Sequence, residues 1–343
     1  MVTPSLGQHV AADKKAAPLL FPIVQNDKTG FIDDTGKVVI PAQFSGSMYG
    51  VSFSEGLAPV GFPGQWDYID TSGKVVIRTT FDSAGSFNEG LAPVGVAGKR
   101  GHQTLDDFKY GYIDKTGKLV IKPQFDETYG FSQGLGRVVA GGKWGFIDKK
   151  GKMVIEPRFK SAYWFKEGLA CVVLDGKYVY IDRTGKVVSS PEYEYRDSWF
   201  SHGMVPVKRG EKWGFISKDW KIVIEPQFDE VAPAFSDGLA SVRLGDKFGY
   251  IDVTGKMVIA PRLDSYTSRF SEGLAAFKFE GKYGYINKRG DVVIEPMFTN
   301  ALEFKGGLAA VTTDEGVNRV SCCWRRWDYI DKAGKYVWKA DNR

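Results

Sequence analysis

A short pattern of an aromatic residue, isoleucine and a polar turn-forming residue recurs nine times at a nearly constant interval. The pattern begins at Phe31, Tyr68, Tyr112, Phe146, Tyr180, Phe215, Tyr250, Tyr285 and Tyr329. Successive occurrences lie 37, 44, 34, 34, 35, 35, 35 and 44 residues apart. A fixed period of this length is typical of tandem-repeat proteins, whose units pack against their neighbours. The 343-residue chain is therefore predicted to form one repeat array rather than two or three unrelated domains.

Each repeat is predicted to form three short strands joined by tight turns. In one well-preserved repeat, the strand segments are residues 168–173, 178–182 and 187–188. Apolar residues alternate with small or polar ones along these segments, which indicates half-buried strands. The two connections contain Gly176 and Gly185, as hairpin turns that need a positive φ do. We name the strands C, A and B in chain order and predict an antiparallel meander.

A link of about a dozen residues follows each B strand. Residues 156–167 are an example, with Pro157 near the start and the aromatic residues Phe159 and Phe165 further on. Proline has no N–H group to donate, so it ends the ladder there. The aromatic side chains are predicted to fold back over the core. The composition agrees with many strands and turns, because the chain contains 41 glycines and 14% aromatic residues.

The polar residue that follows the repeated isoleucine is always Asp, Asn or Ser, for example Asp148. All three types hydrogen-bond their own backbone two residues on, so we predict a turn-capping role. A calcium site is not favoured, because no EF-hand loop or calcium-binding nonapeptide occurs. Most of these turns end in Gly-Lys, as at Lys152. We predict that these lysines protect the sheet edges, with a surface for an acidic partner as the alternative.

Residues 144–159 carry a family resemblance. They read Trp-Gly-Phe-Ile-Asp-x-x-Gly-Lys-x-Val-Ile-x-Pro-x-Phe, and residues 165–170 continue with Phe-x-Glu-Gly-Leu-Ala. This pattern resembles the bacterial WG (KWG) repeat, and residues 212–216 are a second close match. The resemblance covers roughly residues 19 to 338. Among the departures, Thr79 replaces the usual proline and Trp220 replaces the turn glycine. The resemblance implies an all-β repeat fold and a role as an interaction module, but no particular chemistry.

The fold class is predicted as all-β, a tandem array of about nine three-stranded antiparallel units. A single unit buries too little to be stable alone, so the units must stack. An open β-solenoid is favoured, because propeller blades usually have four strands and complete units at both ends leave no strand to exchange. A closed propeller-like ring is the alternative. The array is expected to span residues 19–338, with tails at residues 1–18 and 339–343.

Candidate binding residues lie in two insertions between strands C and A. Both 44-residue intervals arise there, in residues 95–110 and 312–327. Insertions at equivalent positions project from one face of a repeat protein, often its binding face, and Trp and Arg are enriched at binding hot spots. The alternative is neutral drift of surface loops. The predicted binding residues are Arg100, His102, Asp106, Arg319, Trp324, Arg325 and Arg326.

The sequence offers little support for catalysis. The chain has three histidines and three cysteines, and it lacks the motifs of zinc proteases, serine hydrolases, nucleotide-binding loops and redox Cys-x-x-Cys sites. We therefore predict no enzyme activity, no metal and no cofactor. The net charge of +5 comes from interspersed charges, so nucleic acid is not an expected partner. No apolar run is long enough to span a membrane.

These observations favour a protein-binding scaffold, for example an inhibitor or immunity-type partner of a secreted bacterial effector. A glycan- or cell-surface-binding module is the first alternative, in which Trp164 and Trp199 of the links stack on sugars. An enzyme with a non-obvious site is the second. The sequence as given predicts a cytoplasmic protein, or a periplasmic or secreted one if an export signal has been removed.

Overall fold

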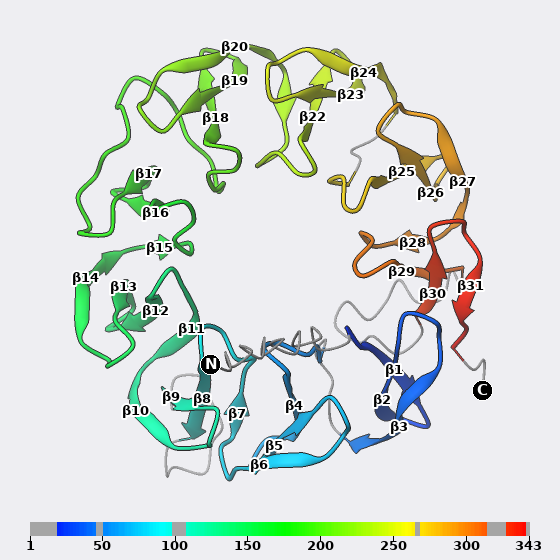
Figure 1. Ribbon diagram of the computed structural model, residues 1–343. Coiled ribbons are helices and arrows are strands. Elements are labelled where there is room, and N and C mark those ends of the chain that lie inside the picture. Colours follow the sequence, from blue (N-terminus) through cyan, green and yellow to red (C-terminus); the bar gives the residue numbers. More distant parts are fainter. Residues whose placement is uncertain (1–18, 46–50, 98–107, 265–267, 314–326, 341–343) are drawn as a thin grey trace, which may run out of the picture.

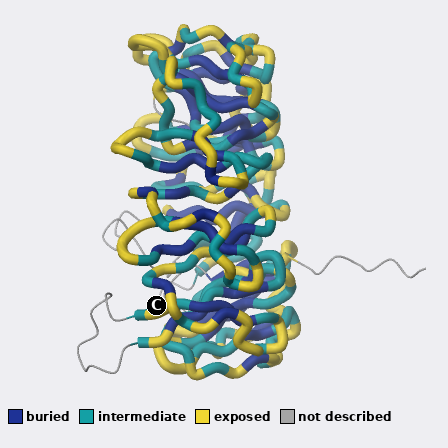
Figure 2. The backbone as a smooth tube through the Cα atoms, turned by 90° about the vertical axis from the view of Figure 1, so that its left-hand side faces the viewer, coloured by how far each residue is buried: buried dark blue, intermediate teal, exposed yellow. Residues whose placement is uncertain are grey.

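The chain folds into a ring of nine small β-sheets. The computed structural model describes residues 19–45, 51–97, 108–264, 268–313 and 327–340. These residues form thirty-one strands and no helix, and all strand pairs are antiparallel within sheets of three or four strands. Figure 1 shows the sheets arranged around a centre, and Figure 2 shows the ring edge-on, with buried residues inside the sheets. The predicted all-β tandem array is confirmed.

The units are numbered 1 to 9 in chain order, and each contributes one strand of each type, except that unit 5 has no B strand. The C strands are β1 (Phe21–Gln25), β4 (Leu57–Phe62), β8 (Leu91–Ala97), β12 (Leu135–Ala140), β16 (Ala170–Leu174), β18 (Met204–Arg209), β22 (Leu239–Leu244), β25 (Leu274–Phe279) and β29 (Leu308–Thr312). The A strands are β2 (Lys28–Ile32), β5 (Gln65–Asp70), β9 (Phe108–Asp114), β13 (Lys143–Ile147), β17 (Lys177–Ile181), β19 (Lys212–Ser217), β23 (Lys247–Asp252), β26 (Lys282–Asn287) and β30 (Asp328–Asp331). The B strands, at the outer wall of the ring, are β3 (Val38–Ser45), β6 (Val75–Arg78), β10 (Leu119–Phe125), β14 (Met153–Phe159), β20 (Ile222–Phe228), β24 (Met257–Leu263), β27 (Val292–Phe298) and β31 (Tyr336–Trp338). Unit 5 has only an isolated bridge between Ile181 and Val187 in place of a B strand.

The links contribute a fourth strand that the three-strand prediction did not include. In five units a short segment of the link pairs with the C strand of the unit that follows it. These inner strands are β7 (Ser83–Ala84), β11 (Glu127–Ser132), β15 (Ser161–Ala162), β21 (Glu230–Val231) and β28 (Asn300–Ala301). Four of these sheets therefore have four strands, as propeller blades usually do, whereas the sheet of β15 has three because unit 5 lacks a B strand. The link covers the core as predicted, because the buried Phe165 ring packs edge-on against Phe146 at 4.9 Å.

The polar residue after the repeated isoleucine caps the A–B turn, as predicted. Asp148 Oδ1 accepts hydrogen bonds from the backbone N–H groups of Lys150 and Lys152, both at 2.9 Å. The same pair of contacts recurs in the other units that carry Asp or Asn at this position: Asp33, Asp70, Asp114, Asp182, Asp252, Asn287 and Asp331. The side chain thereby satisfies two N–H groups that the hairpin itself leaves without partners.

The array closes into a ring, so the preference for an open solenoid is wrong and the alternative arrangement is correct. Units 1 and 9 form separate sheets, so the expectation that no strand is exchanged holds. Closure comes instead from side-chain packing. Phe21 and Ile23 of unit 1 share one buried cluster with Leu308 and Tyr329 of unit 9. An open array would leave one apolar face of each end unit exposed to water. Burying these side chains between units 1 and 9 is therefore favourable in free energy.

Candidate functional site

The residues that the sequence singled out for binding lie outside the described residues. Arg100, His102 and Asp106 fall in the range 98–107, and Arg319, Trp324, Arg325 and Arg326 fall in the range 314–326. The strand ends that flank both ranges are described, because Ala97 lies opposite Phe108 and Val311 lies opposite Asp328. Both insertions are therefore attached at the C–A edge of their units. The binding role of these seven residues stays a prediction.

The links line the centre of the ring, and the turn between β15 and β16 and the turn between β28 and β29 both point inward (Figure 1). Trp164 of the link before unit 5 and Trp199 of the link before unit 6 lie side by side, with ring centroids 5.8 Å apart. Trp164 is 40% exposed, which is high for so large an apolar side chain. The sequence suggested each of these tryptophans as a residue that stacks on sugars, and the structure shows that neighbouring units bring the two together.

Cationic side chains lie on these tryptophan rings. Lys166 Nζ lies 5.7 Å from the ring centroid of Trp199, and the guanidinium of Arg269 lies 5.7 Å from the same ring. Arg269 comes from the link before unit 8, two links away, and it forms an ion pair with Glu303 through Nε at 3.1 Å. A cation held over the face of an indole is attracted by the ring quadrupole. We name Trp164, Lys166, Trp199 and Arg269 the central aromatic surface.

Arg137 continues this surface on the side of unit 4. Its guanidinium lies 4.7 Å from the ring centroid of Tyr129, 5.6 Å from Trp144 and 5.3 Å from Trp164. One terminal nitrogen donates to the backbone oxygen of Ala162 at 2.8 Å. Burial lowers the pKa of the Arg137 guanidinium from its ordinary value, although the group stays charged at neutral pH. The three rings and Arg137 form an aromatic box around one positive charge.

The sequence analysis missed Arg137, although the repeat alignment contains a signal for it. In every unit one C-strand residue lies directly opposite the repeated aromatic residue of strand A. That position is held by Pro22, Pro59, Pro93, Arg137, Cys171, Pro206, Ser241, Ala276 and Ala310. Arg137 is the one charged residue in this column of the nine described units. A charge placed among small and apolar residues is a departure that an alignment of the units would reveal.

Several polar side chains in the turns that end the links join neighbouring units. Each link ends in a two-residue turn in which both residues have positive φ, for example Glu55 and Gly56 at 53° and 84°. The Glu55 carboxylate accepts a hydrogen bond from the N–H of Gly90 in the next turn at 3.0 Å and pairs with Lys115 Nζ at 3.0 Å. The equivalent contacts to the next turn are made by Glu89, Gln133, Glu167, Asp237 and Glu272. These side chains therefore have a structural role between units.

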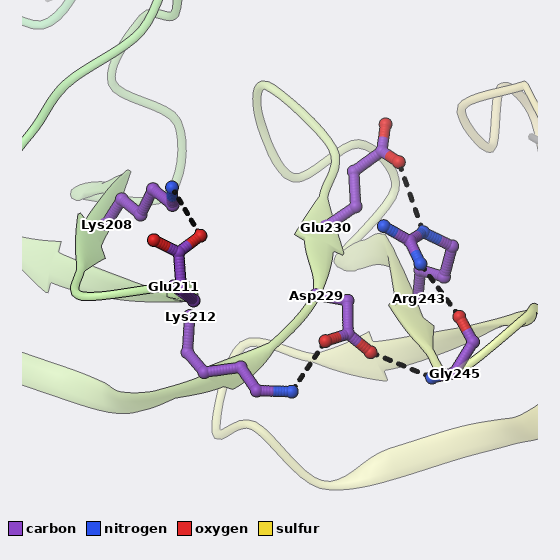
Figure 3. Close-up of polar contacts among 7 residues, drawn as sticks. All are labelled: Lys208, Glu211, Lys212, Asp229, Glu230, Arg243 and Gly245. Carbon is purple, nitrogen blue, oxygen red and sulfur yellow. Dashed lines mark hydrogen bonds and ion pairs between the residues drawn. The ribbon is translucent and has the colours of Figure 1, made fainter.

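A second set of contacts joins the units at the C–A edge. Figure 3 shows Asp229 between Lys212 Nζ of unit 6, at 2.5 Å, and the backbone N–H of Gly245 of unit 7, at 2.8 Å. The hydrogen bond from Lys212 holds the pKa of the Asp229 carboxyl below its usual value. Arg243 pairs with Glu230 in the same view, at 3.3 Å. These contacts give Asp229 a structural role between units 6 and 7.

Among the described residues, Cys171 and His202 lie in surroundings that suit a structural role. Burial raises the pKa of the Cys171 thiol to about 12, which keeps it protonated and unreactive at neutral pH. His202 occupies the rim-turn position that Glu, Gln, Asp or Gly holds in other units, and its ring packs against Phe235 at 6.2 Å. In the described part of the chain, no three His, Cys, Asp or Glu side chains gather in a way that could hold a metal ion. No helix there is long and apolar enough to cross a membrane.

Comparison with known proteins identifies the repeat. The family described as "WG containing repeat" matches residues 30–66, 68–99, 110–144, 144–178, 180–213, 213–248, 248–283 and 283–315. No curated protein sequence matches the chain.

Solved structures also match this chain, all at low sequence identity. The structure described as a eukaryotic initiation factor matches with a TM-score of 0.63 and 12% identity, covering 95% of this chain and 98% of that one. The dihydro-heme d1 dehydrogenase NirN in complex with DHE has a TM-score of 0.47 and 12% identity, covering 94% of this chain and 73% of that chain. Hsv2p of Kluyveromyces lactis has a TM-score of 0.38 and 13% identity, covering 60% and 74%. At such low identity the first match concerns the fold alone.

Proposed function

Since this chain belongs to the family of WG containing repeats, we propose that it is a non-catalytic scaffold whose ligand is another protein. The observation that carries the proposal is the central aromatic surface, where Trp164 and Trp199 lie side by side and remain accessible among cationic side chains. An inhibitor or immunity-type role toward a secreted bacterial effector is one form that this function would take. The proposed location is the cytoplasm, with the periplasm or the outside of the cell as the alternative if an export signal has been removed.

The residue types found at the hot spots of protein–protein interfaces support a protein as the partner. Tryptophan and arginine are the residue types most enriched where a few side chains carry most of the binding free energy. Here both types come from different units and are held in place by the ring, so little side-chain entropy is lost when a partner binds. The sequence-predicted insertions remain a second candidate contact region, with Arg325 and Arg326 as the residues to test.

A glycan ligand is the second candidate function, because two adjacent tryptophan rings also suit the apolar faces of sugars. The two proposals differ in what should bind the purified protein. A protein partner should be recovered from an extract of the source organism, whereas a glycan partner should be found on a glycan array. Both should depend on Trp164 and Trp199, so the class of ligand is decided by which assay gives binding.

The test compares three variants with the native chain. The purified partner should bind the Trp164→Ala/Trp199→Ala variant at least tenfold more weakly, measured by calorimetry. Phe279→Ala is the matched control, because Phe279 is an aromatic residue that is 49% exposed and lies at the C–A edge of unit 8. Arg325→Glu/Arg326→Glu tests the insertion. If the tryptophan variant binds the partner normally and the arginine variant does not, the insertion contacts the partner instead of the central aromatic surface. A glycan that binds where no protein does would overturn the proposal.

A further inference from the structure

Arg137 carries a positive charge that no described carboxylate neutralises. Two other arginines contact tryptophan rings, and both have an acidic partner: Arg196 contacts Trp213 and pairs with Asp197 at 3.7 Å, and Arg269 contacts Trp199 and pairs with Glu303. Arg137 forms no ion pair with any residue that the structure describes. Glu127, on the same strand as Tyr129, accepts a hydrogen bond from the Tyr129 hydroxyl at 3.1 Å instead.

The hydrogen bonds of Arg137 are also incomplete. A guanidinium has five N–H donors. One terminal nitrogen donates to Ala162, while the buried Nε has no hydrogen-bond partner in the described structure. Buried donors of charged groups are rarely left without partners, since desolvating them costs free energy. The cation–π contacts with three rings compensate only part of that cost.

The surroundings of Arg137 are accessible to a ligand. Tyr129 and Trp164, which form two walls of the box, are each 40% exposed. Trp164 is also the residue that joins the box to Trp199. A group bound at Arg137 would therefore continue onto the apolar surface of the tryptophan pair.

We propose that Arg137 receives the carboxylate of an acidic side chain of the protein partner, and so decides which partners bind. The proposal rests on the proposed function and names the chemistry of one contact within it. A carboxylate matches the planar fork of a guanidinium, which binds it through two parallel hydrogen bonds. The box holds one positive charge, so it suits a single carboxylate with apolar neighbours better than a chain of acidic sugars.

The experiment uses three defined probes and the full chain. The first probe is an octapeptide, acetylated at its N-terminus and amidated at its C-terminus, with one glutamate between leucine and tyrosine. The second is the same peptide with glutamine, and the third is an oligogalacturonate. Binding is followed by tryptophan fluorescence, because the rings of Trp144 and Trp164 contact Arg137. The glutamate peptide should bind at least fivefold more tightly than the glutamine peptide. Arg137→Met should abolish the difference.

Arg78→Gln is the matched control, because it removes the same charge from an exposed residue of the outer strand β6. It should leave the preference for glutamate unchanged. A second measurement needs no variant: in the native chain, binding of the glutamate peptide should weaken as the pH falls through about 4.3, the ordinary pKa of the peptide's own carboxyl. Binding of the glutamine peptide should not change over that range.

Two results would overturn the proposal. Equal binding of the two peptides to the native chain would show that Arg137 does not select a carboxylate. Tighter binding of oligogalacturonate than of the glutamate peptide would assign the site to an acidic glycan. If either result occurs while the partner still depends on Trp164 and Trp199, the protein-binding proposal stands and only the role of Arg137 is lost.

Discussion

The hydroxyl of Tyr329 donates a hydrogen bond to the backbone oxygen of Pro22, 2.9 Å away and 307 residues earlier in the chain. Inside the array the equivalent tyrosine uses the link that follows it, as Tyr285 does when it donates to Leu302 at 2.7 Å. The aromatic contact is also reproduced: Phe21 packs on Tyr329 at 5.5 Å, as Phe304 packs on Tyr285 at 4.9 Å. The first strand therefore supplies to unit 9 the contacts that a link supplies elsewhere.

Replacing Phe21 should weaken the closure of the ring. In the other units an alanine or a similarly small residue often occupies the position of Phe21, as Ala58 does opposite Ile69. Phe21→Ala should cost about 3–5 kcal/mol of unfolding free energy, since a buried aromatic ring is lost. Hydrogen exchange should become faster in β1 and in β29 to β31. Tyr285→Phe, which removes the internal hydrogen bond, is the control and should affect only units 8 and 9. Unchanged protection of the terminal units in Phe21→Ala would contradict this role.

Trp220 fills a space that isoleucine fills in other units. In most units the turn glycine lies against an isoleucine of the preceding B strand, so that a Cβ on Gly255 would come within 3.1 Å of Ile224. Unit 5 has no B strand, and Trp220 of unit 6 packs there against Tyr180 at 6.0 Å and Tyr195 at 6.1 Å. At this interface the large side chain therefore comes from the turn of unit 6, whereas at most other interfaces it comes from the B strand of the preceding unit.

Trp220→Gly should therefore destabilise the protein, although glycine is the usual residue at this turn. The cavity should cost about 3–5 kcal/mol, and relief of the positive φ at Trp220 should return about 1 kcal/mol. Denaturant unfolding measures the difference. Trp164→Ala is the control, because that exposed ring should cost no more than about 1 kcal/mol. A Trp220→Gly variant as stable as the native chain would show that the neighbours collapse into the space.

The inner-rim contacts predict that stability falls in acid. Burial tends to raise the pKa of the Glu272 carboxyl, but hydrogen bonds from Gly306 and Gly307 and the charge of Lys332 outweigh it and hold the pKa below 4.5. A carboxyl whose pKa is lowered by folding stabilises the protein above its unfolded-state pKa, and this contribution is lost as the pH falls through the folded-state value. Glu272→Gln should lower the melting temperature at pH 7, and the difference from the native chain should shrink and disappear as the pH falls through the lowered pKa of Glu272. A difference that persists in acid would mean that the charge does not matter.

Cys171 should be inert until the protein unfolds. Its thiol pKa of about 12 leaves almost no thiolate at pH 8. In a Cys322→Ser/Cys323→Ser variant, a thiol reagent should label no cysteine in the native state and one cysteine in denaturant. Rapid labelling under native conditions would show that the unit opens locally.

The repeat, its three main strands and its turns could be predicted from the sequence, because they depend on residues close together in the chain. The period of the aromatic-isoleucine pattern defined the units, and Asp148 capped its turn because a short side chain can reach only the adjacent backbone. Trp164 and Trp199 could be named as candidate binding residues because both lie in the links, but their contact with each other was found only in the structure.

Tertiary structure alone decided the closure of the ring and the arrangement around its centre. Closure depends on the angle between successive units, which accumulates over nine interfaces and cannot be inferred from any one of them. The aromatic box around Arg137 combines strands β11, β12 and β13 of one unit with Trp164 from the next link. No pattern within a short stretch of sequence could therefore predict that these side chains come together. Short-range chemistry fixed each unit, whereas the packing of side chains between units determined which residues face the centre together.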